Sequence, residues 1–90
     1  MRERWFGATG RRVPEIVLEG SLDLAGALVL DGVTDVARIE DAHERGTPIV
    51  VRAWSADEVV RALARPEVAA ALVRDPALLE LDLPELTYGA

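Results

Sequence analysis

The sequence predicts one small domain of the α+β class, or a small α/β domain, with a sheet of three to four strands packed with two to three helices. Three observations lead to this class: a length of 90 residues, a hydrophobic content of 50%, and apolar residues that alternate in some segments and recur with helical spacing in others. The expected order is β-β-α-β-α-α-β. We expect a basic arm at residues 1–12, a core at 13–76, and a C-terminal strand or tail at 77–90.

The first 12 residues are expected to form an arm or a first hairpin, because Gly7 and Gly10 mark a turn. In the segment that follows, every even position from Ile16 to Leu30 is apolar or Gly, and a period of two is typical of strands. We interpret this segment as two strands, at about 14–19 and 26–31, joined by a bend or a hairpin.

The middle of the chain is predicted to form a helix and then a strand. Thr34 or Asp35 is a suitable N-cap for a helix that runs to Arg45, and Gly46 stands where a helix-terminating glycine is expected. The apolar residues at 47–53 (TPIVVRA) give the clearest strand, which we expect to be central and buried.

The C-terminal third is predicted to begin with another helix, because Ser55 and Glu58 have the spacing of a capping box. Residues 66–74 (PEVAAALVR) read as a further helical segment, and the Asp75-Pro76 pair starts another turn. Beyond it, leucines alternate with acidic residues, which indicates a short strand or an extended tail; these leucines are Leu79, Leu81 and Leu83.

Several residue types are missing, and their absence narrows the chemistry. The chain has no Cys and one His, so we expect neither disulfides nor a thiolate or multi-histidine metal site, and no cofactor. All ten cationic side chains are Arg, which excludes a lysine Schiff base or a P-loop lysine. The lack of Lys, Asn and Gln is typical of a thermophile or of a GC-rich bacterium, and both remain open.

Charge is divided unevenly along the chain. Residues 1–14 carry four Arg against Glu3, a balance of +3, whereas residues 15–90 carry six Arg against fifteen acids, a balance of -9. An acidic body repels phosphate, so we expect a protein partner or a second copy of the chain rather than nucleic acid. Because no apolar run approaches the roughly 18 residues of a membrane helix, we also expect no membrane segment and a cytoplasmic location.

Four side chains are candidates for catalysis, although the chain is not expected to be an enzyme on its own. Glu40 and His43 have the Glu-x-x-His spacing that di-iron bundles use on one helix face, and a solvated helix end is the alternative interpretation. Arg52 would hold an anion and His43 would act as acid or base. Asp23 is the fourth candidate, one of several carboxylates expected near strand ends and turns.

Partner binding is expected at the two ends of the chain. The N-terminal segment joins arginines to aromatic residues, and the C-terminal leucines are suited to adding a strand to a neighbour's sheet. A homo-oligomer is therefore expected. The candidate contact residues are Arg2, Arg4, Trp5, Phe6, Arg11, Arg12, Leu81, Leu83 and Tyr88.

Two short stretches resemble known families. RWFGATGRRVPEIVLEG, residues 4–20, is similar to the first hairpin of aldo/keto reductases, which implies a (β/α)₈ barrel with an Asp-Tyr-Lys-His site. The chain is too short for that barrel and has no Lys. GSLDLAGA, LDGVT and PIVVRAWSADEVVRAL resemble STAS domains, the anti-sigma-factor antagonists. Where that family has its phosphorylated Ser, this chain reads DVARIED and has no hydroxyl, and the helix expected between the first two blocks is missing.

These observations favour a small acidic module that binds or regulates another protein. An inhibitor, an antitoxin, an immunity-type protein and a STAS-like scaffold without its phosphosite all fit this description. Two alternatives remain open: an oligomeric ligand-binding or enzyme subunit with a site shared between protomers, and a structural assembly subunit.

Overall fold

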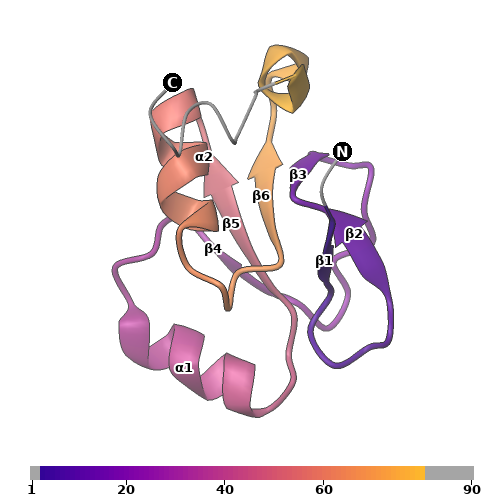
Figure 1. The fold of residues 1–90 in the computed structure, drawn as a ribbon, viewed down its shortest axis with the longest axis vertical. Coiled ribbons are helices and arrows are strands. Elements are labelled where there is room, and N and C mark those ends of the chain that lie inside the picture. Colours follow the sequence, from indigo (N-terminus) through magenta and orange to yellow (C-terminus); the bar gives the residue numbers. More distant parts are fainter. Residues whose placement is uncertain (1–2, 81–90) are drawn as a thin grey trace.

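The computed structural model describes residues 3–80 of the chain. Two helices and two sheets form an α+β fold, as the sequence predicted (Figure 1). The elements in chain order are β1 (Glu3–Trp5), β2 (Arg12–Pro14), β3 (Ile16–Leu18), β4 (Leu28–Leu30), α1 (Val36–Glu44), β5 (Ile49–Ala53), α2 (Ala56–Leu63), β6 (Ala70–Val73) and the short 3₁₀ helix η1 (Pro76–Glu80).

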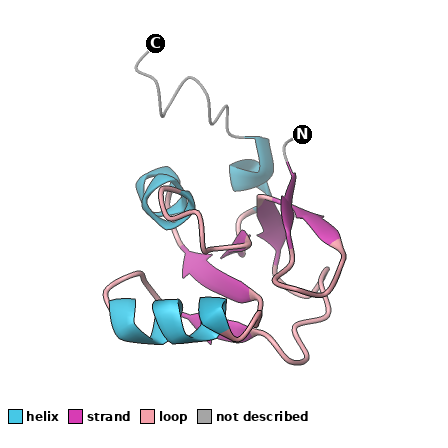
Figure 2. Ribbon diagram, turned by 60° about the horizontal axis from the view of Figure 1, so that its bottom comes forward, coloured by secondary structure: helices cyan, strands magenta, loops and turns pink. Residues whose placement is uncertain are grey.

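The main sheet has four strands in the order β3-β6-β5-β4, and every neighbouring pair is parallel. β4, β5 and β6 are consecutive neighbours joined by α1 and α2, so both helices are crossover connections on the same face of the sheet. β1 and β2 form an antiparallel hairpin that covers part of the other face (Figure 2). Within the segment expected to be an arm or a first hairpin, residues 3–12 therefore belong to this hairpin, whose second strand continues to Pro14.

The two strands expected at 14–19 and 26–31 are present as β3 and β4, but of the bend or hairpin expected between them, the hairpin was wrong. They lie at opposite edges of the sheet, and residues 19–27 cross from one edge to the other. Gly20 and Gly26 turn the chain at the two ends of this crossing with φ of 90° and 80°. Alternation shows which side chains share a face, but it carries no information about which strands pair.

The helix expected at 66–74 was also wrong, because its second half is the strand β6. All four residues of β6 are buried, and the strand lies between β3 and β5. An inner strand of a parallel sheet is covered on both faces and so reads as a continuous apolar run. The alanines that raise helix propensity here let the covering layers approach closely.

The expected helix ends are confirmed. Asp35 caps α1 by accepting the backbone N–H of Arg38 at 3.2 Å, and Gly46 follows the helix with φ of 74°. Ser55 caps α2 by accepting the backbone N–H of Glu58. Within the segment expected to be a strand or tail, residues 77–80 belong to η1, and residues 81–90 lie outside the described part of the chain.

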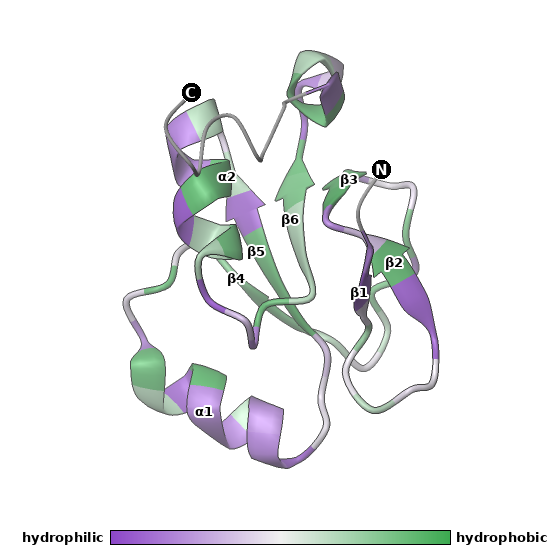
Figure 3. Ribbon diagram, viewed as in Figure 1, coloured by the Kyte–Doolittle hydropathy of each residue, from purple (hydrophilic) through white to green (hydrophobic). Residues whose placement is uncertain are grey.

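The core has two layers, one on each face of the main sheet. The helix face joins Val51 and Val73 to residues of both helices, including Ile39 and Val59. The second face joins strand residues such as Val50 to Phe6 and others from the hairpin. Figure 3 shows the apolar strands between the more hydrophilic outer surfaces of the helices and the hairpin. No helix of the described residues is long and apolar enough to cross a membrane.

Candidate functional site

Charged side chains stand where the four parallel strands end. Glu19 directly follows β3, Arg74 follows β6, Asp31 follows β4, and Arg52 is the last residue but one of β5. The carboxyl ends of parallel strands all lie at the same end of the sheet, so these residues meet there. This is the end at which α/β proteins usually bind their ligands. Together with Trp54, which follows β5, they form the surface that we call the carboxyl-end cluster.

The charges of this cluster are linked into one chain of ion pairs. Glu19 contacts Arg74 at 2.6 Å and Arg52 at 3.8 Å, and Arg52 reaches Asp31 at 3.3 Å. The Arg74 side chain is 68% exposed and that of Asp31 84% exposed. Exposed pairs of this kind each contribute only about 0–1 kcal/mol. The cluster is therefore accessible to another molecule, and the fold depends little on it.

Trp54 is the large apolar member of the cluster, and 57% of it is exposed. The Arg74 guanidinium lies 5.5 Å from its ring centroid. The Trp54 backbone N–H donates to Oε2 of Glu58 at 3.0 Å. Glu58, in the first turn of α2, therefore also fixes the backbone of Trp54. Trp and Arg are the side chains most enriched among residues that dominate protein–protein binding energies.

A shallow pocket of about 220 Å³ adjoins the cluster. The loop at residues 31–34 forms one wall, and Arg61 and Ala62 of α2 form the other. The loop between β4 and α1 therefore belongs to the same surface as the strand ends.

The opposite end of the sheet carries a larger groove, of about 630 Å³, which we call the amino-end groove. It lies between the β1–β2 hairpin, the end of α1 and the loop before β6. One backbone hydrogen bond joins the hairpin to the turn after α1 at this groove: the Ala8 N–H donates to the Gly46 carbonyl oxygen at 2.8 Å. The charged and aromatic residues that line it are Glu3, Arg4, Trp5, Glu15, His43 and Glu67.

Arg4 clamps this end of the molecule together. Its Nε donates to Glu15 at 3.0 Å, and its two terminal nitrogens donate to the carbonyls of Leu63, Arg65 and Val68 at 2.7–3.1 Å. One guanidinium thus joins the hairpin to the end of α2 and to the loop before β6. Glu15 is only 4% exposed, and the Arg4 guanidinium places a positive charge beside its buried carboxylate.

A second ion pair of the groove joins Arg65 to Glu67 at 3.2 Å. A hydrogen bond from its own backbone N–H lowers the pKa of Glu67 below its usual value. Burial raises this pKa, but the positive charges of Arg65 and His43 lower it further, and the net shift is downward. Glu67 is therefore ionised at neutral pH. Its Oε1 atom is buried and has no hydrogen-bond partner among the described residues.

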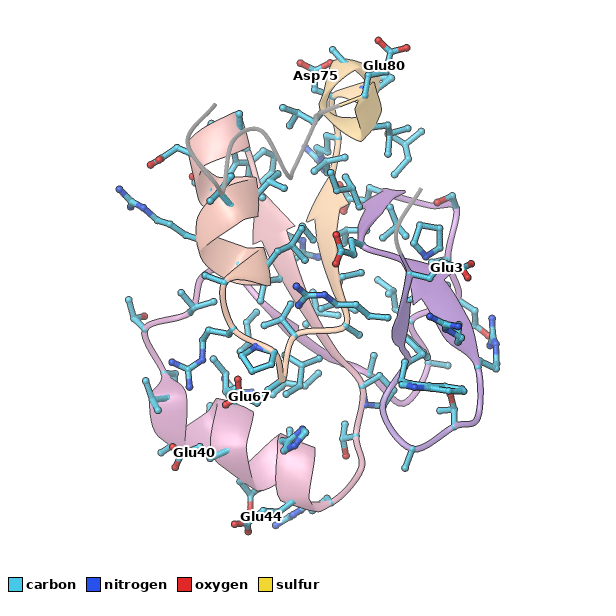
Figure 4. All side chains as sticks on the ribbon, in the orientation of Figure 1. Glu3, Glu40, Glu44, Glu67, Asp75 and Glu80 are labelled. Carbon is cyan, nitrogen blue, oxygen red and sulfur yellow. The ribbon has the colours of Figure 1, made fainter. Side chains whose placement is uncertain are left out.

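The four candidate catalytic residues do not come together. His43 is exposed in the last turn of α1 and lines the amino-end groove, whereas Arg52 lies in the carboxyl-end cluster. Asp23 belongs to the crossing loop, where its Oδ1 accepts the Ala25 N–H at 3.0 Å. Glu40 lies with Glu44 on the outer side of α1, away from Asp75 and Glu80 at the η1 end (Figure 4).

The candidate contact residues of the N-terminal segment divide into buried and exposed. Phe6 is in the core at 3% exposure, and Arg4 is the clamp. Trp5 is 62% exposed, with the Arg12 guanidinium 5.4 Å from its ring, and Arg11 lies over Phe6 at 5.9 Å. The other candidates lie outside the described residues: Arg2, Leu81, Leu83 and Tyr88.

The carboxyl-end cluster was missed as a unit, although the sequence contains a signal for it. Leu18, Leu30 and Val73 each end an apolar run, and each is followed by a charged residue. A list of the charges that directly follow strands would have found Glu19 and Asp31. Arg74 was missed because the strand before it, β6, was predicted to be a helix.

Neither end holds a metal-binding constellation: within residues 3–80, no group of three or more His, Cys, Asp or Glu side chains is placed to hold an ion. Glu19 and Asp31, two of the carboxylates near strand ends, are joined through Arg52 instead.

Comparisons with known proteins give no match: no protein-family model, no curated protein and no solved structure is significantly similar to the chain. The resemblances to aldo/keto reductases and STAS domains thus rest on their short motifs alone.

Proposed function

We propose that this protein is a small binding or regulatory module that docks on another protein through the carboxyl-end cluster. The observation that carries the proposal is Trp54, which is 57% exposed beside Arg74 at the ends of the strands. A large exposed aromatic ring with a stacked guanidinium is the typical anchor of a protein interface. The surrounding ion pairs supply a polar rim.

The charge of the chain supports a partner that is basic overall. The formal net charge is -6, and opposite net charges speed the encounter of two proteins. We place this interaction in the cytoplasm. An inhibitor, an antitoxin, an immunity protein or a STAS-like scaffold without its phosphosite would each act in this way.

The test is native mass spectrometry of the protein purified gently from its own cells. We expect a foreign protein in stoichiometric amount with wild type, and its loss with Trp54→Ala. Trp5→Ala is the matched control, because Trp5 is similarly exposed (62% against 57%) but lies at the other end of the sheet. A partner that is retained by Trp54→Ala and lost with Trp5→Ala would refute docking at the carboxyl-end cluster.

The amino-end groove supports a second candidate function, an oligomeric subunit that binds a ligand or catalyses a reaction at a site shared between protomers. Its volume of about 630 Å³ lies in the range of small-molecule sites, and His43 lines it as a side chain that can both donate and accept a hydrogen bond. This function predicts that His43→Ala abolishes ligand binding or activity without lowering stability. A His43→Ala variant that loses stability but keeps its ligand binding or activity would contradict this second function.

A further inference from the structure

The two edge strands of the main sheet differ in how they are protected against pairing with another strand. β3 lies beside the β1–β2 hairpin and is flanked by Glu15 and Glu19, whereas β4 lies at the far edge of the sheet (Figure 1). Residues 24–30, which include β4, contain no charged residue and no Pro. Charges and prolines are the usual means by which proteins block an exposed edge. The edge at β4 therefore lacks them.

The backbone of β4 offers hydrogen-bonding groups at this edge. The Leu28 N–H donates to the Pro48 carbonyl oxygen at 2.8 Å, so the polar backbone groups of Leu28 point toward β5. In a strand, the backbone groups of successive residues point to opposite sides. The N–H and C=O of Val29 therefore point away from β5, to the side on which no strand of residues 3–80 pairs with β4.

The side chains of β4 leave apolar surface at the same edge. Leu28 and Leu30 belong to the core layer on the helix face, so Val29 points to the opposite face. Leu30 is buried, but Leu28 and Val29 are only half-buried. A strand added beside β4 would cover apolar surface on both faces of the sheet.

The sequence of β4 is suited to pairing with itself. Two copies related by a two-fold axis perpendicular to the sheet place their β4 strands antiparallel. In the register centred on Val29, the two Val29 residues exchange both of their backbone hydrogen bonds, and Leu28 lies opposite Leu30 of the second copy. Asp31 then lies opposite Ala27, so this register brings no like charges together.

We infer that β4 is a dimerisation edge, and that it joins the sheets of two copies of this chain into one continuous sheet. This inference goes beyond the proposed function and does not depend on it. Because the two β4 strands are antiparallel, the two carboxyl-end clusters point in opposite directions, and the dimer presents a docking surface at each end. The paired strands are short, with three residues each, so the dimer is weak and depends on concentration.

The position of the two-fold axis is tested by opposite charges at one residue. Val29→Lys and Val29→Glu each place like charges directly opposite each other in the dimer, whereas a mixture of the two variants places Lys opposite Glu. We expect sedimentation equilibrium to show association at least about tenfold weaker than wild type for each variant alone, and to show its recovery in an equimolar mixture. Trp5→Lys is the control, because Trp5 is exposed in the hairpin, and it should associate as wild type does.

The backbone hydrogen bonds are tested by Val29→Pro, which removes the outward N–H. An N–H that faces solvent at a sheet edge can be replaced by Pro without loss of a ladder bond, so the monomer should still fold, and circular dichroism checks this. Val29→Thr keeps both the N–H and the branched side chain and is the matched control. We expect Val29→Pro to abolish association and Val29→Thr to retain it. If Val29→Pro fails to fold, the Lys and Glu variants alone decide.

Salt provides a further measurement, because each copy has a formal net charge of -6 and the paired strands contain no ion pair. Screening of the repulsion should make the wild-type dimer stronger at 0.5 M salt than at 0.05 M salt. A dimer that salt weakens would overturn the inference. So would a wild type that stays monomeric at millimolar concentration, or a Lys and Glu mixture that associates no better than either variant alone. Protection of the Val29 amide only in a complex with a foreign protein would assign the edge to a foreign strand and would also overturn it.

Discussion

The two ends of the sheet carry ion pairs of similar length that differ in burial. At the amino end, Arg4 and Glu15 are 3.0 Å apart, and their side chains are 22% and 6% exposed. At the carboxyl end, Arg74 and Glu19 are 2.6 Å apart, and their side chains are 68% and 31% exposed. The first pair is therefore part of the fold, and the second remains open to a partner. Burial separates the two roles, and distance does not.

The largest effect is expected from Arg4→Met, which breaks the buried pair and removes four hydrogen bonds. It removes a cation from the 4%-exposed Glu15 and a donor from three backbone carbonyls, so we expect the free energy of unfolding to fall by about 3–5 kcal/mol. Urea denaturation measures this loss. Arg12→Met is the control, because Arg12 is exposed in the same hairpin and should change stability by less than about 0.5 kcal/mol. Equal losses would contradict the clamp.

A smaller loss is expected from Gly7→Ala, where the hairpin meets the turn after α1. The added Cβ would lie 2.5 Å from the Gly46 carbonyl oxygen and 2.6 Å from the Pro48 nitrogen, at a φ of +57°. Gly10→Ala is the matched control, because its φ is +78° but nothing lies within 4 Å of the added Cβ. The control should lose about 1–2 kcal/mol from backbone strain alone, and Gly7→Ala should lose more. Similar melting temperatures would show that the close approach does not matter.

A pH-dependent effect is expected from Glu67→Gln at the same end. Because the pKa of Glu67 is lowered in the folded protein, this residue stabilises the fold at neutral pH, and its contribution is lost as the pH falls below the usual glutamate value of 4.5. The stability difference between wild type and variant should therefore shrink in acid. Urea curves at pH 7 and at pH 3 measure it, and Glu44→Gln shows the effect of removing an exposed carboxylate. A difference that grows in acid would contradict the assignment.

The smallest effect on stability is expected at the carboxyl end. Arg74→Ala breaks a short ion pair and a ring contact, but both are exposed, so the free energy of unfolding should change by less than about 1 kcal/mol. Partner binding, by contrast, should fall. If this variant were as unstable as Arg4→Met, the distinction between the two ends would be wrong.

Local signals in the sequence predicted much of the fold. Asp35, Gly46, Ser55 and Glu58 placed both helices, because caps depend on neighbours within a few residues. The run at 47–53 gave the central strand. Local signals failed where a distant contact decides the structure: the alanines of β6 form a strand because two layers cover them, and residues 19–27 cross the sheet because β3 pairs with β6.

The candidate site was harder to predict than the fold. Arg4 was expected at a partner surface because sequence shows its charge, but its position over three carbonyls depends on the packing of segments some sixty residues apart. Trp54 looked like a residue between a strand and a cap. Only the parallel order of the strands brings it beside Arg74.

Hydrogen exchange, measured on the complex isolated from cells and on the free protein, tests the difference between the two ends most directly. The account predicts added protection in the loops that follow the strands, at residues 19–22, 31–34, 54–56 and 74–76. It predicts unchanged exchange at 3–8, 43–47 and 65–68, which line or support the amino-end groove. Protection confined to the groove segments would contradict docking at the carboxyl-end cluster and would favour a ligand or partner at the amino end.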